Sequence, residues 1–495
     1  MIRTDGGLVL VGPSGEACAK RSEEARLVVS GAPPQATVDG LVAPAFAPLV
    51  DLLRPQDHTV IALRTDLAMV STHELTCCPT ETSPPDTTIE PSALRSANDL
   101  AAVDNLKTLV DFRYGPIPAL FRTGHLPLAT ATAELDHHTA GYGRTSTFEE
   151  AERVAIFEAV ERLNGLRPRT RSTVEASFSE LGDEALDPAR VGLCDFDQRY
   201  TPDLRMRWAQ AWSYSQNRPI LVPEQVAYYG ADTPPEQRFV YETSNGCGLG
   251  NSLTEAVLHG LFEVAERDAF LMAWYARTPL ERLRIPDDPL LHHLADRLEE
   301  QGYELLFLNA TNDLGIPAVL TLARTGDITL PTAFFAAGAS PDPVQAMRSA
   351  AVEVAVDVES FADRVRARPD DYTEERLRRL LEDPAQVRTM DDHVAVNTLP
   401  EAAARHDFLV SDETTELPDE RDHTSLEELL DRYARRLELI AVDQTDPVTA
   451  SRFGLHSAKV VVPGTLPMTF GHLHRRTHGL PRLAELRNPH PHPFP

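Results

Sequence analysis

Two stretches of the chain place glutamate and arginine at the same helical spacing. Residues 157–162 read Phe-Glu-Ala-Val-Glu-Arg, and residues 262–267 read Phe-Glu-Val-Ala-Glu-Arg. Side chains three and four residues apart lie on one face of a helix, so each stretch gathers its charges on one side. The second stretch continues into an almost entirely apolar run, which predicts a buried helix. Buried carboxylates need a cation, a base or a hydrogen-bond network, and Mg²⁺ commonly bridges carboxylates to phosphates.

These stretches admit two interpretations. A Glu-Arg pair at i and i+4, such as Glu263 and Arg267, is usually solvated and stabilises its helix only slightly. If both helices instead turn the same face to one cavity, four carboxylates converge, and the residues predict a Mg–nucleotide site. The converging residues would be Glu158, Glu161, Glu263 and Glu266.

A glycine-rich turn, residues 246–251, leads into the second helix. Ser252 and Glu255 form a Ser-x-x-Glu pattern, which indicates the start of that helix. Backbone N–H groups at such a start can hold an anion. The turn lacks the Gly-Lys-Ser/Thr of a phosphate loop and the acidic residue of a dinucleotide-binding fold. A tight turn that simply requires glycine is an equal alternative.

The composition limits the classes of partner. With 75 acidic and 47 basic residues the net charge is −28, which argues against nucleic acid or an anionic membrane as partner. Lysine is so scarce that phosphate binding is expected to use arginine, backbone amides or metal. The lysines are Lys20, Lys107 and Lys459.

Cysteine usage and the apolar runs predict a soluble, cytoplasmic protein. The N-terminus is a poor signal peptide, and no run approaches the roughly 18 apolar residues of a membrane span. The five cysteines are an odd, scattered set, which is not a disulfide framework. They are Cys18, Cys77, Cys78, Cys194 and Cys247.

Helical and strand patterns alternate along the chain, so we expect an α/β (α+β) fold. Residues 1–79 form a small N-terminal α/β segment, and the Thr-, Ser- and Pro-rich residues 80–105 read as a linker. Residues 106–495 are expected to form one large domain. Within it, the charged helical stretch 365–435 is interpreted as a surface insertion.

The chain ends in Asn-Pro-His-Pro-His-Pro-Phe-Pro. Alternating proline excludes helix and interior strand and favours an extended conformation. A disordered end is the common alternative. The apolar Phe494 and the lack of charge after Arg487 favour a packed tail, because solvated tails are more polar.

In combination these motifs resemble the YcaO family, over about four fifths of the chain from residue 109 to Pro495. The central motif is ETSNGCGLGNSLTEAVLHGLFEVAERDAFLMAWYAR, the earlier one GYGRTSTFEEAERVAIFEAVERL (141–163), and the later one AMRSAAVEVA (346–355). The ending PHPFP resembles the Pro-x-Pro-x-Pro terminus of azoline-forming members. The motif sequences are similar to those of family members in thiopeptide or linear azole-containing peptide pathways.

The resemblance implies an ATP-binding fold in which glutamates hold Mg²⁺ against phosphates. It implies that Cys, Ser or Thr of a ribosomal precursor peptide attacks the preceding amide, whose oxygen is phosphorylated and leaves, giving thiazoline or oxazoline. Carried over by motif, the metal residues are Glu158, Glu161, Glu263 and Glu266. The nucleotide-binding residues are Ser244, Asn251, Glu255, Arg267, Arg348 and Glu353, and the residues of the catalytic tail are Pro491, Pro493 and Pro495.

Three positions depart from the family's pattern. Val154 stands where Ser is frequent, Tyr142 where Lys is frequent, and Ser349 aligns with the usual arginine, with Arg348 one place earlier. These changes keep open a catalytically weak scaffold that binds precursor and partner. A thioamide- or amidine-forming relative is a third alternative, and a metal-dependent hydrolase built on His259 is a distant fourth.

The expected partners are the precursor peptide and a separate activating-enzyme-like protein that binds its leader. Residues 1–79 faintly resemble the end of such a domain but are too short for the whole of it. Adjacent Cys77 and Cys78 also exclude a four-cysteine zinc site there. A homodimer is the expected oligomeric state.

Overall fold

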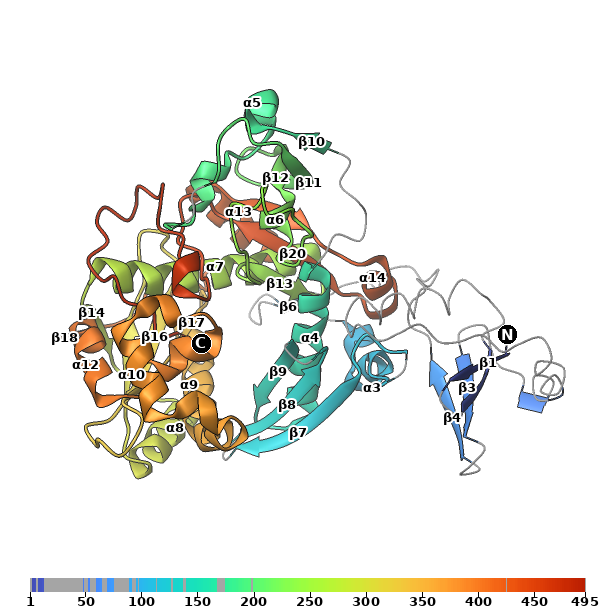
Figure 1. The fold of residues 1–495 in the computed structure, drawn as a ribbon, viewed down its shortest axis with the longest axis horizontal. Helices are drawn as coiled ribbons and strands as arrows, with labels where there is room; N and C mark the ends of the chain where they lie inside the picture. Colours follow the sequence, from blue (N-terminus) through green and yellow to red (C-terminus); the bar gives the residue numbers. More distant parts are fainter. Residues whose placement is uncertain are drawn as a thin grey trace.

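The computed structural model shows helices interleaved with mainly antiparallel sheets (Figure 1). This mixture confirms the predicted fold class. No helix in the described ranges is long and apolar enough to cross a bilayer. The structure describes residues 2–5, 8–12, 48, 52–53, 59–64, 69–74, 89–90, 95–96, 98–112, 114–125, 128–136, 139–166, 174–196, 199–423 and 425–494.

Three sheets build the part of the chain that follows α3 (Val103–Leu106). The three-stranded sheet contains β7 (Ala119–His125), β8 (Leu128–Glu134) and β9 (Ala140–Thr145). The six-stranded sheet has the order β10 (Val174–Ala176), β11 (Met206–Ser213), β19 (Ile440–Asp443), β20 (His456–Val461) and β13 (Cys247–Gly250), with β12 (Arg218–Pro223) also on β11. The five-stranded sheet has the order β17 (Ala333–Ala339), β16 (Ala318–Arg324), β15 (Glu304–Asn309), β14 (Leu280–Leu283) and β18 (Val410–Thr415).

Three long helices lie between and against these sheets. They are α4 (Phe148–Leu166), α7 (Leu253–Ala276) and α9 (Pro343–Ala367). The shorter helices are α5 (Phe178–Leu181), α6 (Glu224–Ala227), α8 (Pro289–Glu300), α10 (Glu374–Glu382), α11 (Met390–Ala395), α12 (Ala403–His406), α13 (Leu426–Arg436) and α14 (Pro447–Phe453).

Each long helix follows a strand and packs on it, giving the units β9–α4, β13–α7 and β17–α9. Glycine permits the close approach. A Cβ at Gly143 of β9 would lie 1.8 Å from the Ala151 carbonyl oxygen of α4, and one at Gly248 of β13 would lie 2.2 Å from the Ala256 oxygen of α7. The two repeated Glu-Glu-Arg phrases therefore belong to two helices that are placed by the same local architecture.

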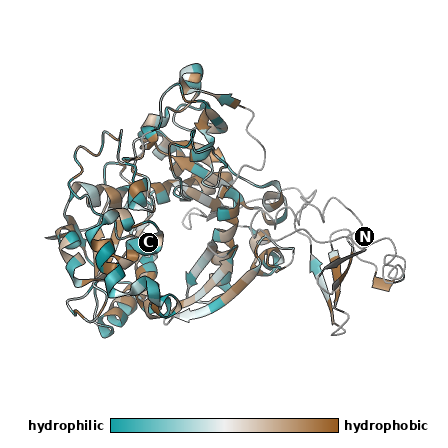
Figure 2. Ribbon diagram, viewed as in Figure 1, coloured by the Kyte–Doolittle hydropathy of each residue, from teal (hydrophilic) through white to brown (hydrophobic). Residues whose placement is uncertain are grey.

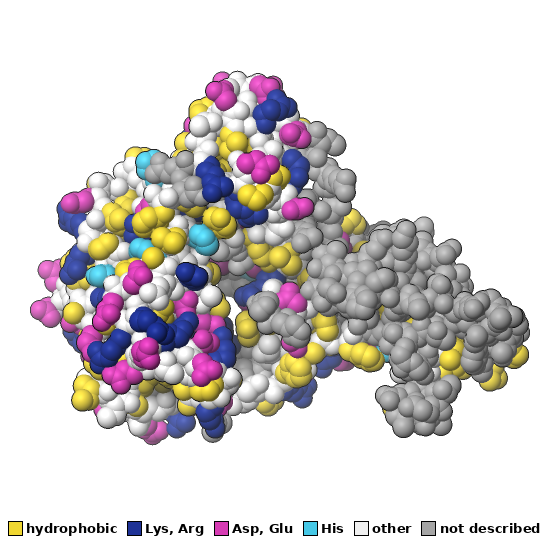
Figure 3. Space-filling view, viewed as in Figure 1, with side chains coloured by type: hydrophobic (Ala, Val, Ile, Leu, Met, Phe, Trp, Pro, Cys, Tyr) yellow, Lys and Arg dark blue, Asp and Glu magenta, His cyan; other side chains and the backbone are white. Residues whose placement is uncertain are grey.

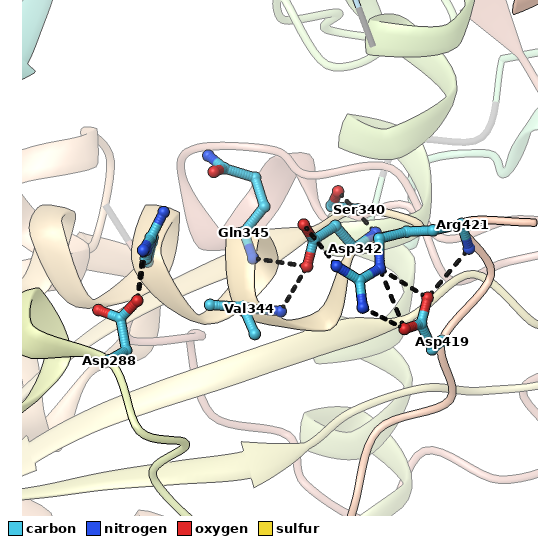
Figure 4. A network of polar contacts seen from close by, with 8 residues as sticks. Asp288, Ser340, Asp342, Val344, Gln345, Asp419 and Arg421 are labelled. Atoms are coloured by element: carbon cyan, nitrogen blue, oxygen red, sulfur yellow. Dashed lines mark hydrogen bonds and ion pairs between the residues drawn. The ribbon is translucent and has the colours of Figure 1, made fainter. Parts of the chain in front are cut away.

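The starts of α7 and α9 are fixed by side-chain caps. The Ser252 hydroxyl accepts a hydrogen bond from the Glu255 N–H at 3.2 Å, which confirms the predicted start of α7. At α9, Asp342 accepts from the N–H groups of Val344 and Gln345 at 2.9 and 3.3 Å. Figure 4 shows this cap beside Arg421, whose guanidinium lies 3.6 Å from Asp342. The cap fixes the helix that carries Glu353 toward the interior.

Helix α7 is buried along nearly its whole length, as its apolar sequence predicted. Its first half packs with β20 and α13 around residues such as Leu258 and Val460. Its second half packs on the five-stranded sheet around Trp274 and Phe335. One helix thus joins both large sheets, and any charge on it must be compensated inside the protein.

The stretch 365–435 is only partly a surface insertion. Helix α10 is hydrophilic, and Figures 2 and 3 show its teal ribbon and intermingled acidic and basic side chains. However, β18 joins the five-stranded sheet in parallel with β14, and Leu377, Leu380 and Val396 share a small core. We therefore correct the interpretation: this stretch completes a sheet and, through α11, approaches the interior.

The described part of residues 1–79 is an antiparallel sheet in the order β1 (Ile2–Asp5), β2 (Leu8–Val11), β3 (Thr59–Arg64) and β4 (Met69–Glu74). His73 Nδ1 of β4 lies 2.6 Å from the Asp111 carboxylate, which joins this sheet to the rest of the chain. The predicted linker includes a hairpin of β5 (Ile89–Glu90) and β6 (Arg95–Ser96), and α3 begins before the predicted boundary at residue 106. Cys77 and Cys78 lie outside the described residues.

Asp268, in the middle of α7, is fully buried and is the anchor of three segments. Its carboxylate accepts hydrogen bonds from Asn312 Nδ2 and from the Leu466 N–H, each at 2.7 Å. Two nitrogens of Arg482 donate to it at 2.7 and 2.9 Å. A buried carboxylate with this many donors is costly to neutralise, because its partners lose their acceptor.

We expect Asp268→Asn to lower the free energy of unfolding by about 3–5 kcal/mol, because it leaves the partly buried Arg482 guanidinium without its main charge partner. Asp313→Asn is the matched control, since Asp313 also pairs with Arg482 but is 62% exposed. Loss of this exposed pair should lower the free energy of unfolding by about 0–1 kcal/mol. Thermal unfolding of both variants checks this. Equal shifts of the melting temperature in the two variants would show that the buried Asp268–Arg482 pair stabilises the protein no more than the exposed Asp313–Arg482 pair does.

Candidate nucleotide and metal site

A cavity of about 410 Å³ lies where the three strand–helix units converge. Figure 3 looks onto the hollow between the α9 lobe and the β7–β8–β9 sheet. Polar residues from all three long helices line it, together with the loop before β13 and residues of α11. The charged lining residues are Arg144, Glu158, Glu161, Arg162, Glu263, Arg267, Glu353, Asp357, Arg364, Arg368 and Asp391.

Two glutamates of α4 meet one of α7 and one of α9 in this cavity. Burial, together with the negative charges of Glu263 and Glu158, raises the pKa of Glu161 to about 8 against the opposing charge of Arg162. Burial also raises the pKa of Glu263 and Glu353. These carboxylates are short of compensating positive charge, which is the property expected of cation ligands.

Backbone donors fix two of the carboxylates. The Gly246 N–H donates to Glu263 Oε2 at 2.6 Å, and the Tyr142 N–H donates to Glu158 Oε2 at 2.6 Å. Arg162 also holds Glu158, at 2.5 Å. Each glutamate therefore keeps a defined orientation while its other oxygen faces further partners.

The predicted metal residue Glu266 does not line the cavity. Burial raises its pKa to about 7, and Arg267 opposes this effect from 3.3 Å. The charges of Glu353 and Glu263 also raise this pKa, so all three carboxylates belong to one electrostatic cluster.

Arginines face the same space. Arg144 lies 3.9 Å from Glu353, and Arg267 lies 3.8 Å from Glu263. Nη1 of Arg267 is buried and has no hydrogen-bond partner within the described part of the chain. Such an orphaned charged donor suits an anionic oxygen, because the guanidinium otherwise keeps an uncompensated desolvation cost.

The remaining predicted nucleotide residues divide into two groups. Ser244, like Arg267 and Glu353, lines the cavity. Asn251 and Glu255 lie at the start of α7 outside the lining, where Asn251 accepts a hydrogen bond from Asn98 at 3.2 Å and Glu255 is buried.

Arg348 is half-exposed and pairs with Asp288, whose pKa it lowers against the effect of burial. The structure does not bring this arginine to the cavity. Ser349, which aligns with the usual arginine of the family, is exposed on the same helix and also lies outside the cavity lining. Neither of the two positions therefore supplies an arginine to the cavity.

Several lining residues escaped the sequence reasoning. Arg144 follows the Gly-Tyr-Gly of β9, and its signal was strand alternation, since Tyr142 and Arg144 both face the cavity. Asp357, Arg364 and Arg368 continue the helix face that begins at Glu353. Their signal was the helical period of α9 beyond the recognised motif.

The proline-rich tail is ordered from Arg487 to Phe494, which favours the packed alternative over a disordered end. Trp274 Nε1–H donates to the His490 carbonyl at 3.0 Å, and the Phe494 ring lies 5.3 Å from that of Phe270. Phe494 is fully buried, and the Arg267 guanidinium lies over its ring at 4.3 Å. The tail thus reaches a residue that lines the cavity.

Pro491 and Pro493 lie within this ordered segment, whereas Pro495 lies outside the described residues. The catalytic role of the tail stays a prediction, because contact with Arg267 places the tail next to the cavity without assigning it a reaction step.

The residues present fit Mg²⁺ and a nucleotide. In the described ranges, no three acidic, histidine or cysteine side chains are close enough to hold a metal ion by themselves. Mg²⁺ is usually held by one or two carboxylates, with phosphate oxygens and water completing six positions. The carboxylate cluster of Glu158, Glu161 and Glu263 would supply the metal ligands, and Arg267 would supply a hydrogen-bond donor for phosphate.

Comparisons with known proteins agree with this assignment. Residues 142–466 match the sequence family described as YcaO cyclodehydratase, ATP- and Mg²⁺-binding. An uncharacterised protein from the tfuA 3′ region of Rhizobium leguminosarum bv. trifolii is 30% identical over 254 residues, covering 47% of this chain and 58% of that protein. The match therefore spans less than two thirds of that relative.

Solved structures of low identity share the fold. A heterocyclase in complex with substrate and cofactor has a TM-score of 0.74 at 21% identity, covering 100% of this chain and 77% of that chain. The YcaO protein of Methanopyrus kandleri, bound with AMPPCP and Mg²⁺, has a TM-score of 0.52 at 22% identity, covering 76% and 92%.

The family match covers more than half of the chain and includes the carboxylates and arginines that line the cavity. ATP and Mg²⁺ are therefore the cofactors expected of these residues, and the protein belongs to the YcaO family.

Proposed function

We propose that this protein is an ATP-dependent cyclodehydratase that converts Cys, Ser or Thr of a ribosomally made precursor peptide to thiazoline or oxazoline. The observation that carries the proposal is the meeting of two features at Arg267. This arginine faces the carboxylate cavity, and its guanidinium lies 4.3 Å from the ring of Phe494 in the proline-rich tail. A reaction that needs both phosphate handling and proton transfer would take place at such a junction.

The reaction balances without an oxidant. The side-chain thiol or hydroxyl adds to the carbonyl carbon of the preceding amide. In total the peptide loses the carbonyl oxygen and two hydrogens, which correspond to one water. Mg-ATP supplies the phosphoryl group that makes this oxygen a leaving group, so that the oxygen ends in inorganic phosphate. The products are azoline, ADP and phosphate.

The protein's own residues have separable tasks in this proposal. Glu158, Glu161 and Glu263 hold the cation, and Glu266, the fourth predicted metal residue, adds negative charge to their cluster. Arg267 and Arg144 offset negative charge that develops on the transferred group. Ser244 and Glu353 line the nucleotide side. The tail that contains Pro491 and Pro493 positions the group that takes the nucleophile's proton.

Partners and location are part of the proposal. A separate activating-enzyme-like protein that binds the leader of the precursor is proposed as a partner. A thiopeptide or linear azole-containing peptide pathway is proposed on the motif resemblance, and a homodimer is proposed because symmetric dimers are the commonest soluble oligomers. A reducing, cytoplasmic location is proposed on the odd, scattered set of five cysteines.

Glu263→Gln is expected to weaken Mg-dependent nucleotide binding by about tenfold or more, because a charged contact is worth about 1.5–3 kcal/mol. Glutamine keeps an oxygen for the Gly246 N–H, so the helix should remain in place. Calorimetry with a non-hydrolysable ATP analogue and Mg²⁺ measures the change.

Glu300→Gln is the control for loss of one negative charge, since Glu300 is 72% exposed on α8 and remote from the cavity lining. It should bind the analogue as the unaltered protein does. If both variants bind equally well, the carboxylate cluster does not hold the metal.

The reaction itself is tested by incubating the protein with ATP, Mg²⁺, the precursor peptide encoded beside it and any activating-enzyme-like neighbour. The peptide should lose one water per ring, and heavy oxygen placed in the reacting amide should appear in inorganic phosphate. Deleting residues 491–495 should abolish this loss while nucleotide binding persists, because the deletion leaves the carboxylate cluster intact.

Other outcomes separate the alternatives. A gain corresponding to sulfur in place of oxygen would identify a thioamide-forming enzyme. Loss of water with an amine nitrogen bonded to the former amide carbon, located by fragmentation of the peptide, would identify an amidine-forming one. An unchanged peptide mass without ATP turnover would favour the scaffold that Val154, Tyr142 and Ser349 keep open.

A further inference from the structure

The C-terminal tail is held near its end by a side chain from the stretch 365–435. His393 lies on α11 and is 1% exposed. Its Nδ1 lies 2.7 Å from the His492 carbonyl oxygen, and its ring stacks on the His492 ring with centroids 4.1 Å apart. A segment that looks like a surface insertion in the sequence thus contacts the tail two residues before Phe494.

The hydrogen bonds fix the protonation of this histidine. The Gly471 N–H, which can only donate, points at His393 Nε2 from 3.1 Å. Nε2 must therefore be the unprotonated nitrogen, and Nδ1–H donates to the His492 carbonyl. Burial lowers the pKa of His393 to about 4, in agreement with a neutral ring. The imidazole is a directional bridge between the Gly471 loop and the tail.

The partner ring is fixed in the same way. His492 Nε2 lies 2.9 Å from the Thr469 carbonyl oxygen and must donate to it. Burial lowers the pKa of His492 as well, so two neutral rings stack without repulsion. The tail carbonyl and the tail ring are both held, which restrains its rotation and its register along α7.

The register of the tail reaches the cavity through Phe494. This ring is fully buried beneath the guanidinium of Arg267, which lines the cavity beside Glu263. Met390 and Asp391, on the same short helix as His393, also line the cavity. Helix α11 therefore contacts both the cavity and the segment that presents Phe494 to it.

We propose that His393 is a positioning residue that clamps the tail beside the cavity by donating its Nδ1–H to the His492 carbonyl. This inference rests on the proposed function, in which the seated tail takes part in cyclodehydration. His393 does not touch the reacting atoms and acts through the tail.

Two conservative variants separate this role from simple packing. Asn at position 393 places an N–H near the place of Nδ1 and keeps the donor to His492, but it loses the acceptor for Gly471. Gln places its oxygen near the place of Nε2, keeps the acceptor for Gly471 and loses the donor to the tail. If His393 clamps the tail, His393→Asn keeps the tail in place and retains most of the rate of ring formation, whereas His393→Gln and His393→Ala do not.

The first measurement reports on the tail directly. Fluorine NMR of the full chain, with 4-fluorophenylalanine in place of Phe494, should show one buried resonance that persists in His393→Asn. It should become mobile or divide into several resonances in His393→Gln and His393→Ala. This readout requires neither substrate nor turnover, so it tests the clamp even if the proposed reaction fails.

The second measurement is kinetic. His393→Gln should lower kcat for ring formation by about three- to tenfold, in line with loss of one hydrogen bond, while KM for ATP stays within twofold. In a chain lacking residues 491–495, the same substitution should leave nucleotide binding unaffected, because the clamp then has nothing to hold. An unchanged fluorine resonance, or better function of His393→Gln than of His393→Asn, would overturn the clamp.

Discussion

Repulsion among buried carboxylates is the constraint on which the rest of this structure depends. Glu158, Glu161 and Glu263 line one cavity, where burial and the negative charges of Glu263 and Glu158 raise the pKa of Glu161. Such a group is tolerable only if nearby donors offset part of the charge and a cation offsets the remainder. The Gly246 and Tyr142 N–H groups and the arginines supply the first part. The remaining deficit of positive charge fits the ATP and Mg²⁺ binding of the family.

The fold meets this constraint with rigid elements. Helices α4, α7 and α9 each pack closely on the strand before them, and glycine in β9 and β13 allows backbone contact that a side chain would prevent. Since α7 is buried against both large sheets, its charged face cannot turn to solvent. Asp268 on the same helix is compensated by donors from three segments, among them Arg482, whereas Glu263 is left facing the cavity. One helix therefore carries a structural and a functional carboxylate with different compensation.

The proline-rich tail and α11 form a second set of contacts beside the cavity. Aromatic and histidine rings fix the extended segment, which contributes apolar contact at Phe494 and hydrogen bonds along its backbone. The guanidinium of Arg267 is shared between the tail ring and the carboxylates. Movement of the tail would thus change the environment of an arginine in the site. This coupling gives a physical reason for an apolar ending in an otherwise acidic chain.

The sequence by itself determined the helical faces that carry Glu158, Glu161 and Glu263, the capped start of α7 and the ordered character of an apolar proline-rich end. These follow from local rules, since helical period, capping and proline geometry depend on neighbours in the chain. The resemblance of its motifs also pointed to the family and implied its cofactors. Only the tertiary structure decided that Glu266, Asn251, Glu255 and Arg348 lie outside the cavity lining. It also decided that Arg144, Asp357 and Arg364 line the cavity and that α11 holds the tail. The reason is that convergence depends on how strands and helices pack at long range, and a helical face does not specify which other face it will meet.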